Sequence, residues 1–485
     1  MAEVIGGNFW KPYTAASIAA MKPNAARSSG NSDVGVVGEN PIMFQKRAPI
    51  DLNNPRLREL ARALGPACVR VSGTWANSVW FDDSRGPPPK ATPAGFKGVL
   101  TREEWKHVIE FARAVDAKLV TSFAISAGVR DAKGVWTPVQ ARKLIDYTRS
   151  IDGHIAAAEF FNEPDMPQYG GAPKGYDAQD YARDFAVFRK FVKASAPNML
   201  IVGPGSVGEG VLMPHMSGGL ANGVMKTVDI LSATPRPIFD IFSYHFYGAA
   251  SLRCASMGEG AQTTAADALS EAWLARTDTA YDFYVKGLRD RYEPGAPVWI
   301  TETADAACGG NPWAKTFLDS FRYLDQLGRL AKRGVAVVFH NTLASSEYGL
   351  LDSTTFEPRP DYWAALLWHR LMGSTVLDAG SSQAGLHLYA HCTPDHPGGV
   401  TLLAINTSRD QVRSLNLSRR SRRYTLSAAR LEDTTMRLNG RTLALGTRGS
   451  LPSFHGIPTE AGPVRLAPAT IAFFTFDSAD NPECR

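Results

Sequence analysis

The sequence AAAEFFNEP at residues 156–164 predicts a buried strand that delivers a carboxylic acid, because its apolar run stops at Asn162-Glu163-Pro164. A second apolar run, VWITET at residues 298–303, brings up Glu302 in the same way. Glycoside hydrolysis uses two carboxyl groups, one to protonate the leaving oxygen and one to attack or stabilise the anomeric carbon. A Glu-Pro step also ends many ordinary strands at a turn, so the first motif alone leaves both interpretations open.

Strand-like and helix-like segments alternate along most of the chain. Eight short apolar runs are separated by helical patterns, and they lie at residues 34–37, 67–72, 118–126, 155–161, 199–202, 238–244, 298–301 and 335–339. Eight strands, each followed by a helix, predict an α/β fold of the (β/α)8 TIM-barrel type, with the active site at the C-terminal ends of the strands. Glu163 then ends strand four and Glu302 ends strand seven, so both face one cleft. A doubly wound open sheet is the structural alternative.

Two helices in this alternation have recognisable starts. Asn54 precedes Pro55, which favours the first position of a helix, and Thr101 stands three residues before Glu104 in the pattern of a capping box. Both signals come just before apolar residues at helical spacing, so we expect helices to begin there.

After about residue 375 the chain changes to short alternating segments broken by Gly, Pro and Ser, which is typical of a β-sandwich. We therefore expect three parts. An N-terminal segment at 1–33 joins the sandwich as a strand, a catalytic barrel spans 34–374, and a β-sandwich domain spans 375–485. One large domain with a smaller companion is the ordinary organisation for 485 residues.

The composition excludes several classes of protein. A net charge of +5 on 485 residues is too mild for a nucleic-acid binder, although it leaves room for an acidic substrate. No apolar run approaches the ~20 residues of a membrane span. The five cysteines form no Cys-x-x-Cys pair, so we expect no metal and no cofactor. We expect a monomer that is secreted or periplasmic rather than cytoplasmic, although residues 1–25 contain no intact secretory signal.

Two of the cysteines follow strands that lead into the predicted cleft. Cys254 comes after strand six and Cys308 after strand seven, so both should lie in loops on the catalytic face. We predict that they form a disulfide beside the cleft.

A fixed order of motifs carries a family resemblance. It comprises Asn40, LRELARAL at 57–64, VRVSGT at 69–74, Asn-Glu-Pro at 162–164, His-Phe-Tyr at 245–247, Thr-Glu-Thr at 301–303, Gly-Gly at 309–310 and Pro-Asp-Tyr-Trp at 360–363. In this order the chain resembles the heparanase-type β-glucuronidases, glycoside hydrolase family 79, over roughly residues 34–377. The resemblance implies a barrel with a β-sandwich built partly from the N-terminus.

The resemblance also implies roles for individual residues. Glu163 matches the acid/base and Glu302 the nucleophile, while Asn162 would hydrogen-bond the 2-hydroxyl of the sugar. Tyr247 matches a tyrosine that hydrogen-bonds the nucleophile and keeps it ionised. His245 lies on the same strand end as Tyr247, where a role in the cleft and a core histidine bound to a backbone group are both open.

A glucuronidase must recognise the carboxylate of its sugar. By resemblance, this anion is held by the backbone amides of Gly309 and Gly310 and by Tyr348, although without the resemblance the two glycines would indicate only a flexible turn. Asn40 and Thr74 match positions that line the terminal-sugar subsite.

One position of that subsite departs from heparanase, which has an aspartate before the asparagine, whereas this chain has Gly38-Glu39. Glu39 is then the candidate substitute, one position along. The chain also has no long insertion between Asn40 and Thr74, so we expect no proteolytic activation.

The leading hypothesis is a retaining endo-β-glucuronidase acting on heparan sulfate or a related acidic polysaccharide. The alternative within enzymes is an exo-β-glucuronidase acting on small or terminal glucuronides. A non-catalytic polysaccharide-binding protein on the same barrel is the alternative of another class, and it would be expected to lack Glu163 or Glu302. The basic run at 419–423 is either a solvated face or a glycan contact.

Overall fold

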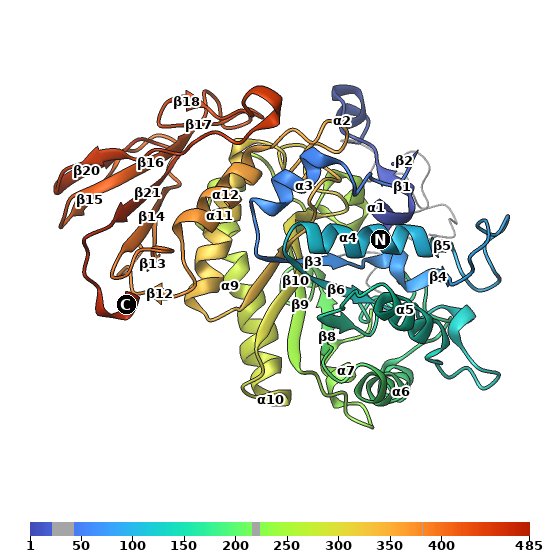
Figure 1. Cartoon of the computed structure of the whole chain (residues 1–485). Helices are drawn as coiled ribbons and strands as arrows, with labels where there is room; N and C mark the ends of the chain where they lie inside the picture. The colour runs from blue at the N-terminus through green and yellow to red at the C-terminus, as the bar shows by residue number, and fades with distance from the viewer. Residues whose placement is uncertain (22–42, 216–223, 381) are drawn as a thin grey trace. The chain divides into compact units, whose positions relative to one another are not determined.

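The computed structural model describes residues 1–21, 43–215, 224–380 and 382–485 (Figure 1). These residues form two compact units. The barrel unit comprises Met1–Gln262, Thr279–Gly309 and Ala336–Asn341, and the C-terminal unit comprises Thr263–Asp278, Gly310–Val335 and Thr342–Arg485. Among the described helices, none has both the length and the apolar character that a membrane crossing requires.

A parallel sheet forms the centre of the barrel unit. In the described residues its seven strands pair in the order β3 (Ala67–Val71), β6 (Ala117–Ser122), β7 (Ala157–Glu159), β8 (Leu200–Val207), β9 (Ile241–Ala250), β10 (Val298–Ala307) and β11 (Val337–His340). The end strands β3 and β11 also lie close together, so the sheet is nearly closed into the predicted TIM-like barrel. The predicted first strand, at 34–37, lies outside the described residues.

Helices follow the strands, as predicted. They include α3 (Pro55–Arg62), α4 (Arg102–Ala114), α5 (Val139–Ser150) and α6 (Ala178–Ser195), and Figure 1 shows α4, α5 and α6 outside the strands. The Asn54 side chain caps α3 and Pro55 occupies its first turn, while Thr101 and Glu104 form a complete capping box on α4. Both predicted helix starts are confirmed. Because helices cover the sheet, strands such as β9 are buried along their whole length and have continuous apolar sequences.

The N-terminal strand differs from the prediction. Strand β1 (Gly7–Trp10) pairs antiparallel with β2 (Phe44–Arg47), and both belong to the barrel unit. The described part of the predicted segment 1–33 therefore contributes no strand to the C-terminal sheet. Its backbone groups are satisfied by a segment nearby in sequence, which requires a shorter chain closure than pairing with a strand after residue 375.

An antiparallel sheet forms the centre of the C-terminal unit. Its described strands are β12 (Val376–Leu377), β13 (Leu386–Cys392), β14 (Val400–Asn406), β21 (Thr470–Phe476), β16 (Ser421–Ser427), β17 (Arg437–Leu438) and β18 (Arg441–Thr442), with β19 (Ile457–Thr459) beside β16. A second sheet pairs β15 (Arg413–Leu417) with β20 (Gly462–Leu466). One apolar cluster draws residues from both sheets, among them Leu417, Leu466 and Phe474, so they pack face to face.

Two helices of the C-terminal unit were predicted within the barrel. Helix α11 (Phe317–Lys332) packs against α12 (Pro360–Leu371) and against β13. The contact with β13 is close, because a Cβ on Gly328 would lie 2.4 Å from the ring of Tyr389. These contacts group both helices with the C-terminal sheet. The prediction had assigned them to the barrel, because both precede the predicted boundary at residue 374.

Candidate active site

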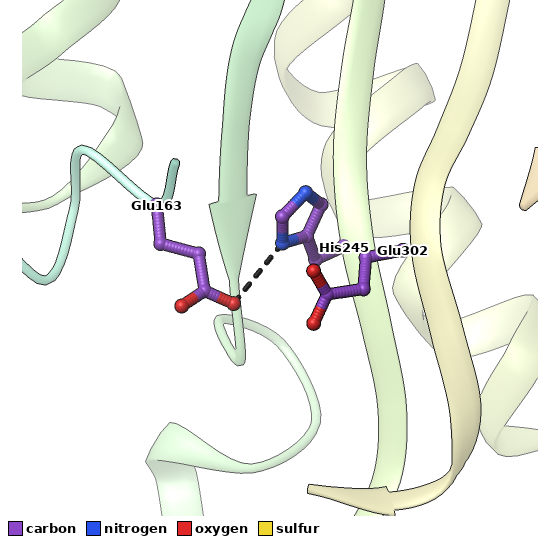
Figure 2. A group of neighbouring side chains, drawn as sticks. All are labelled: Glu163, His245 and Glu302. Carbon is purple, nitrogen blue, oxygen red and sulfur yellow. Dashed lines mark hydrogen bonds and ion pairs between the residues drawn. The ribbon is translucent and has the colours of Figure 1, made fainter. Parts of the chain in front are cut away.

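The two glutamates predicted to catalyse hydrolysis lie together at the C-terminal ends of the strands. Glu302 lies in β10, where the pairing with β9 shifts register between Ile300 and Glu302, and such irregularities re-aim side chains. Glu163 follows β7 and has a φ of +52°, a left-handed conformation that few non-glycine residues adopt. Figure 2 shows both carboxyl groups beside His245, and one atom from each of the three side chains lies within 4.8 Å of the others.

Three hydrogen-bond donors surround the Glu302 carboxylate. The Tyr247 hydroxyl donates to Oε1 at 2.5 Å, and Arg70 Nη1 donates to Oε2 at 2.8 Å. Asn341 Nδ2 donates to the Tyr247 oxygen at 2.8 Å, which leaves the tyrosine proton for Glu302. Burial alone would raise the pKa of Glu302, but the charges of His245 and Arg70 and the Tyr247 hydrogen bond lower it. The carboxyl group is therefore held ionised.

His245 lies between acidic side chains. Its Nδ1 lies 3.0 Å from Oε1 of Glu163, and its Nε2 lies 3.7 Å from Oε1 of Glu159. Burial lowers the pKa of the imidazole, but the Glu302 charge and the contacts with Glu159 and Glu163 raise it to about 9, against the opposing charge of Arg70. The raised pKa favours the protonated imidazole, and the contacts above are with side chains rather than with a backbone group. The role of His245 in the cleft stays a prediction.

Arg70 and Glu159 form a buried ion pair that the sequence analysis did not single out. Arg70 Nε and Nη2 donate to Oε2 of Glu159 at 3.0 and 2.6 Å. Burial would raise the pKa of Glu159, but Arg70 and His245 lower it to about 2. A signal was present, because each residue interrupts an apolar strand sequence and a buried charge requires a partner.

Asn162 is fixed on both its side chain and its backbone. Its Oδ1 accepts a 2.7 Å hydrogen bond from Arg70 Nη2, so its amide nitrogen is the end left to donate. Its backbone N–H and C=O both bond to the buried side chain of Asn77, at 2.8 and 2.9 Å. The residue before Glu163 is therefore held in one orientation. Asn77 also escaped the sequence analysis, since nothing in its surroundings marks it.

The predicted substrate-binding residues are distributed over both units. Thr74 begins a short helix, η2 (Thr74–Ser78), and is half-buried in the barrel unit. Gly309, with a φ of +80°, is the last residue of the segment Thr279–Gly309 of the barrel unit. Gly310 and the buried Tyr348 belong to the C-terminal unit. Glu39 and Asn40 lie outside the described residues, and the binding roles of all six residues stay predictions.

The predicted disulfide between Cys254 and Cys308 is present, with Cα atoms 6.3 Å apart. The described residues contain a second disulfide, Cys392–Cys484, in the C-terminal unit, whereas Cys68 is a free thiol. The sequence analysis did not pair Cys392 with Cys484.

Glu163, His245 and Glu302 are also the described side chains whose spacing could suit a metal ion. A metal ion bound there would have to displace the proton that the neighbouring carboxylates favour on the imidazole.

Comparison with known proteins extends these observations. Residues 46–328 match the family model for the N-terminal domain of glycosyl hydrolase family 79. The chain is 27% identical to heparanase from Bos taurus, over 89% of this chain and 86% of that protein. It is 25% identical to baicalin-β-D-glucuronidase from Scutellaria baicalensis, over 87% of this chain and 83% of that protein.

Among solved structures, the chain is similar to a 4-O-α-L-rhamnosyl-β-D-glucuronidase from Fusarium oxysporum 12S. The TM-score is 0.60 at 15% identity, over 87% of this chain and 91% of that one. At this identity the likeness supports the fold, a barrel with an appended antiparallel sheet domain.

Proposed function

Because this chain belongs to glycosyl hydrolase family 79 and is a glycoside hydrolase, we propose that it is a retaining β-glucuronidase that cleaves internal linkages of an acidic polysaccharide such as heparan sulfate. The observation that carries the proposal is the pair of carboxyl groups of Glu163 and Glu302, with oxygens within 4.8 Å of each other. Retaining glycosidases hold these groups ~5–5.5 Å apart, whereas inverting enzymes separate them by ~6.5–9.5 Å to admit a water.

The first step forms a covalent glycosyl ester. Glu302 attacks the anomeric carbon while Glu163 gives its proton to the glycosidic oxygen, which leaves as a hydroxyl. The lowered pKa of Glu302 supports its role as the attacking carboxylate. His245 bonds to Oε1 of Glu163, so Oε2 is the oxygen left to carry the acid proton.

The second step hydrolyses the ester. Glu163, now a carboxylate, takes a proton from a water that attacks the anomeric carbon, and Glu302 leaves as a carboxylate. The negative charge thus moves from Glu302 to Glu163 and back, while the cationic side chains of Arg70 and His245 stay in place. Because His245 adjoins both glutamates, its charge compensates whichever of them is ionised.

Substrate recognition follows from the remaining polar groups. The Asn162 amide nitrogen is placed to donate to the 2-hydroxyl, because Arg70 occupies its oxygen. For the sugar carboxylate we assign the amides of Gly309 and Gly310 together with Tyr348, since charge-assisted hydrogen bonds discriminate an acid from a neutral 6-hydroxymethyl group. The terminal-sugar subsite is assigned to Asn40 and Thr74, with Glu39 replacing the family's aspartate.

Two disulfides in the described residues support a secreted or periplasmic protein, since structural disulfides persist in oxidising compartments. An extracellular polysaccharide would then be an accessible substrate, and we propose that the enzyme acts on it as a monomer. A non-catalytic binding protein on the same barrel would be expected to lack one of the two carboxyl groups, whereas this chain has both Glu163 and Glu302.

A specific observation favours the second candidate, an exo-acting enzyme on small or terminal glucuronides, because one relative is named baicalin-β-D-glucuronidase and not heparanase. Size-exclusion chromatography of digested heparan sulfate separates the two. Endo action should lower the polymer's mean size early in the digestion, whereas an exo enzyme should hydrolyse p-nitrophenyl β-D-glucuronide and leave that size almost unchanged. Proton NMR of the first product anomer tests retention, and an α product would contradict it.

A further inference from the structure

We infer that Arg253 is a positioning residue for the substrate carboxylate, an inference that rests on the proposed role of the Gly309-Gly310 turn. Arg253 lies in a short helix, η6 (Leu252–Met257), soon after β9, and only 4% of it is exposed. Its Nη1 donates to the backbone oxygen of Gly309 at 3.0 Å and makes a longer contact of 3.4 Å with that of Cys308. The Ser251 hydroxyl also donates to the Cys308 oxygen, at 2.9 Å.

These hydrogen bonds set the direction of two backbone N–H groups. In a planar trans peptide the N–H points opposite to the C=O of the same peptide. The Cys308 carbonyl shares its peptide with the Gly309 N–H, and the Gly309 carbonyl shares its peptide with the Gly310 N–H. Because both carbonyls turn toward Arg253, both N–H groups face the other side of the turn, which is the arrangement that a shared anion requires.

The backbone of this turn is strained and therefore needs support. Cys308, Gly309 and Gly310 all have positive φ, at 63°, 80° and 83°. Two glycines adopt such angles without penalty, but Cys308 does not. Its disulfide to Cys254 and the hydrogen bonds from Arg253 hold it in place.

Arg253 is itself held from behind the turn. Its Nη2 donates to the backbone oxygen of Lys11 at 2.7 Å, and its guanidinium lies 3.8 Å from the ring centroid of Tyr13. A Cβ on Gly309 would lie 2.7 Å from Trp10 and 2.9 Å from Arg253. This side of the turn is therefore filled by protein, and a ligand must approach the turn from the side that its N–H groups face.

Kinetics on a matched pair of substrates test the inference. Wild-type protein, Arg253→Gln and Arg253→Lys would be assayed on p-nitrophenyl β-D-glucuronide and on the corresponding glucoside. Arg253→Gln should raise KM for the glucuronide by about tenfold, the effect of misdirecting one charge-assisted hydrogen bond, with kcat changed less than about threefold. Activity on the glucoside should stay the same. Arg253→Lys should recover part of the loss, because an ammonium can reach one carbonyl but lacks the fork of the guanidinium.

Arg130→Gln provides the matched structural control. Arg130 is another arginine of the barrel unit with a buried side chain. Its guanidinium donates to the backbone oxygen of Ile125 and lies 5.0 Å from the ring centroid of Tyr176. Arg130→Gln should lower Tm, as we also expect of Arg253→Gln, but it should not change the ratio of kcat/KM on the glucuronide to kcat/KM on the glucoside.

The outcomes separate this inference from the proposed function. A wild-type enzyme equally efficient on both sugars would overturn the proposed acid specificity itself. A glucuronide-selective wild type whose Arg253→Gln variant loses activity equally on both sugars, or keeps its KM, would overturn the positioning role alone. If Arg253→Gln does not fold, Arg253→Lys decides, and a selective few-fold rise in the glucuronide KM is the result expected.

Discussion

Each unit of this molecule contains a histidine between two carboxylates, and only one of these histidines belongs to the proposed catalytic site. In the barrel unit His245 bonds to Glu163. In the C-terminal unit the corresponding residue is His387, on β13. Its Nδ1 lies 2.5 Å from Oδ1 of Asp325, and its Nε2 lies 3.0 Å from Oε2 of Glu271. Burial lowers the pKa of both imidazoles, and the neighbouring carboxylates raise both above the ordinary value.

The difference lies in how the carboxylates are otherwise engaged. Oδ1 of Asp325 also accepts from the Tyr389 hydroxyl at 2.5 Å, Oδ2 accepts from Arg329 Nε at 2.6 Å, and the side chain is only 1% exposed. The Glu163 and Glu302 side chains are 19% and 15% exposed. A histidine between carboxylates is therefore no sign of catalysis by itself. Exposure does not separate the two histidines, because the Glu271 side chain is 47% exposed. The barrel unit differs in having a second carboxyl group, that of Glu302, within 4.8 Å of both Glu163 and His245 at the ends of the strands.

The largest expected effect is on activity, and it distinguishes the carboxylates around His245 from those around His387. Glu302→Gln should lower kcat by roughly 10⁴-fold or more, because an amide cannot form the glycosyl ester, while substrate binding remains. Its Tm should fall less than that of Asp325→Asn, because Arg70 keeps Glu159 as a partner. Initial rates on p-nitrophenyl β-D-glucuronide and calorimetry measure the two quantities.

The counterpart in the C-terminal unit, Asp325→Asn, should behave in the opposite way. It should keep kcat near the wild-type value but lower the stability of its unit by about 3 kcal/mol, because a buried charge pair loses one partner. A large loss of kcat in Asp325→Asn without any fall in Tm would break the comparison.

Glu163→Gln should show the next largest effect, and the loss should depend on the leaving group. On heparan sulfate or an alkyl glucuronide, whose leaving oxygen needs protonation, kcat/KM should fall by about 10²–10⁴-fold. On a p-nitrophenyl glucuronide the first step needs little protonation, so the loss there should be smaller. Equal losses on both substrates, measured as kcat/KM, would contradict the acid role.

A smaller effect is expected from removing the charge beside that acid. His245→Gln should lower kcat by roughly 10–100-fold, because a charge-assisted hydrogen bond to Glu163 is lost. The matched variant His387→Gln should leave kcat within about twofold. If both variants lost activity equally, the two histidines would not differ in the way that the position of His245 beside both Glu163 and Glu302 indicates.

The sequence predicted the elements whose evidence is local. Apolar strand sequences and helix starts depend on neighbouring residues, so the barrel strands, the caps at Asn54 and Thr101 and the meeting of Glu163 with Glu302 could be read from the chain. The boundaries between the units were harder to predict from the sequence. The assignment of α11 to the C-terminal unit depends on contacts such as that of Gly328 with Tyr389, which no local pattern marks.

The supporting charges of the site could be predicted only in part. That Arg70 and Glu159 need partners follows from their place in apolar strands, but which partners they take depends on how the barrel closes. Arg70 bonds to Glu302, 232 residues away in sequence. The same holds for His387, whose partners Asp325 and Glu271 lie on two other elements of its unit.

The smallest expected effect is a pH dependence that belongs to His387 alone. Because its folded pKa is raised, its protonation contributes stability fully below about pH 6.5, its ordinary unfolded value, and this contribution is lost as pH rises through the folded pKa. The Tm difference between wild type and His387→Gln should therefore be largest near pH 5.5 and should narrow above pH 6.5. His245 remains in both proteins, so its titration cancels in the difference.

The size of this change follows from the geometry. A neutral imidazole can still donate from Nδ1 to Asp325, whose lowered pKa keeps it ionised over this range, but the charge attraction to Asp325 and the smaller one to Glu271 are lost. The Glu271 side chain is 47% exposed, so water screens its share, and the whole loss should cost about 1–2 kcal/mol, or roughly 2–8 °C in Tm. Calorimetry of both proteins from pH 5.5 to 9 measures it. A Tm difference that stays constant over this range would show that His387 keeps one protonation state, and that its second carboxylate contributes nothing to its charge.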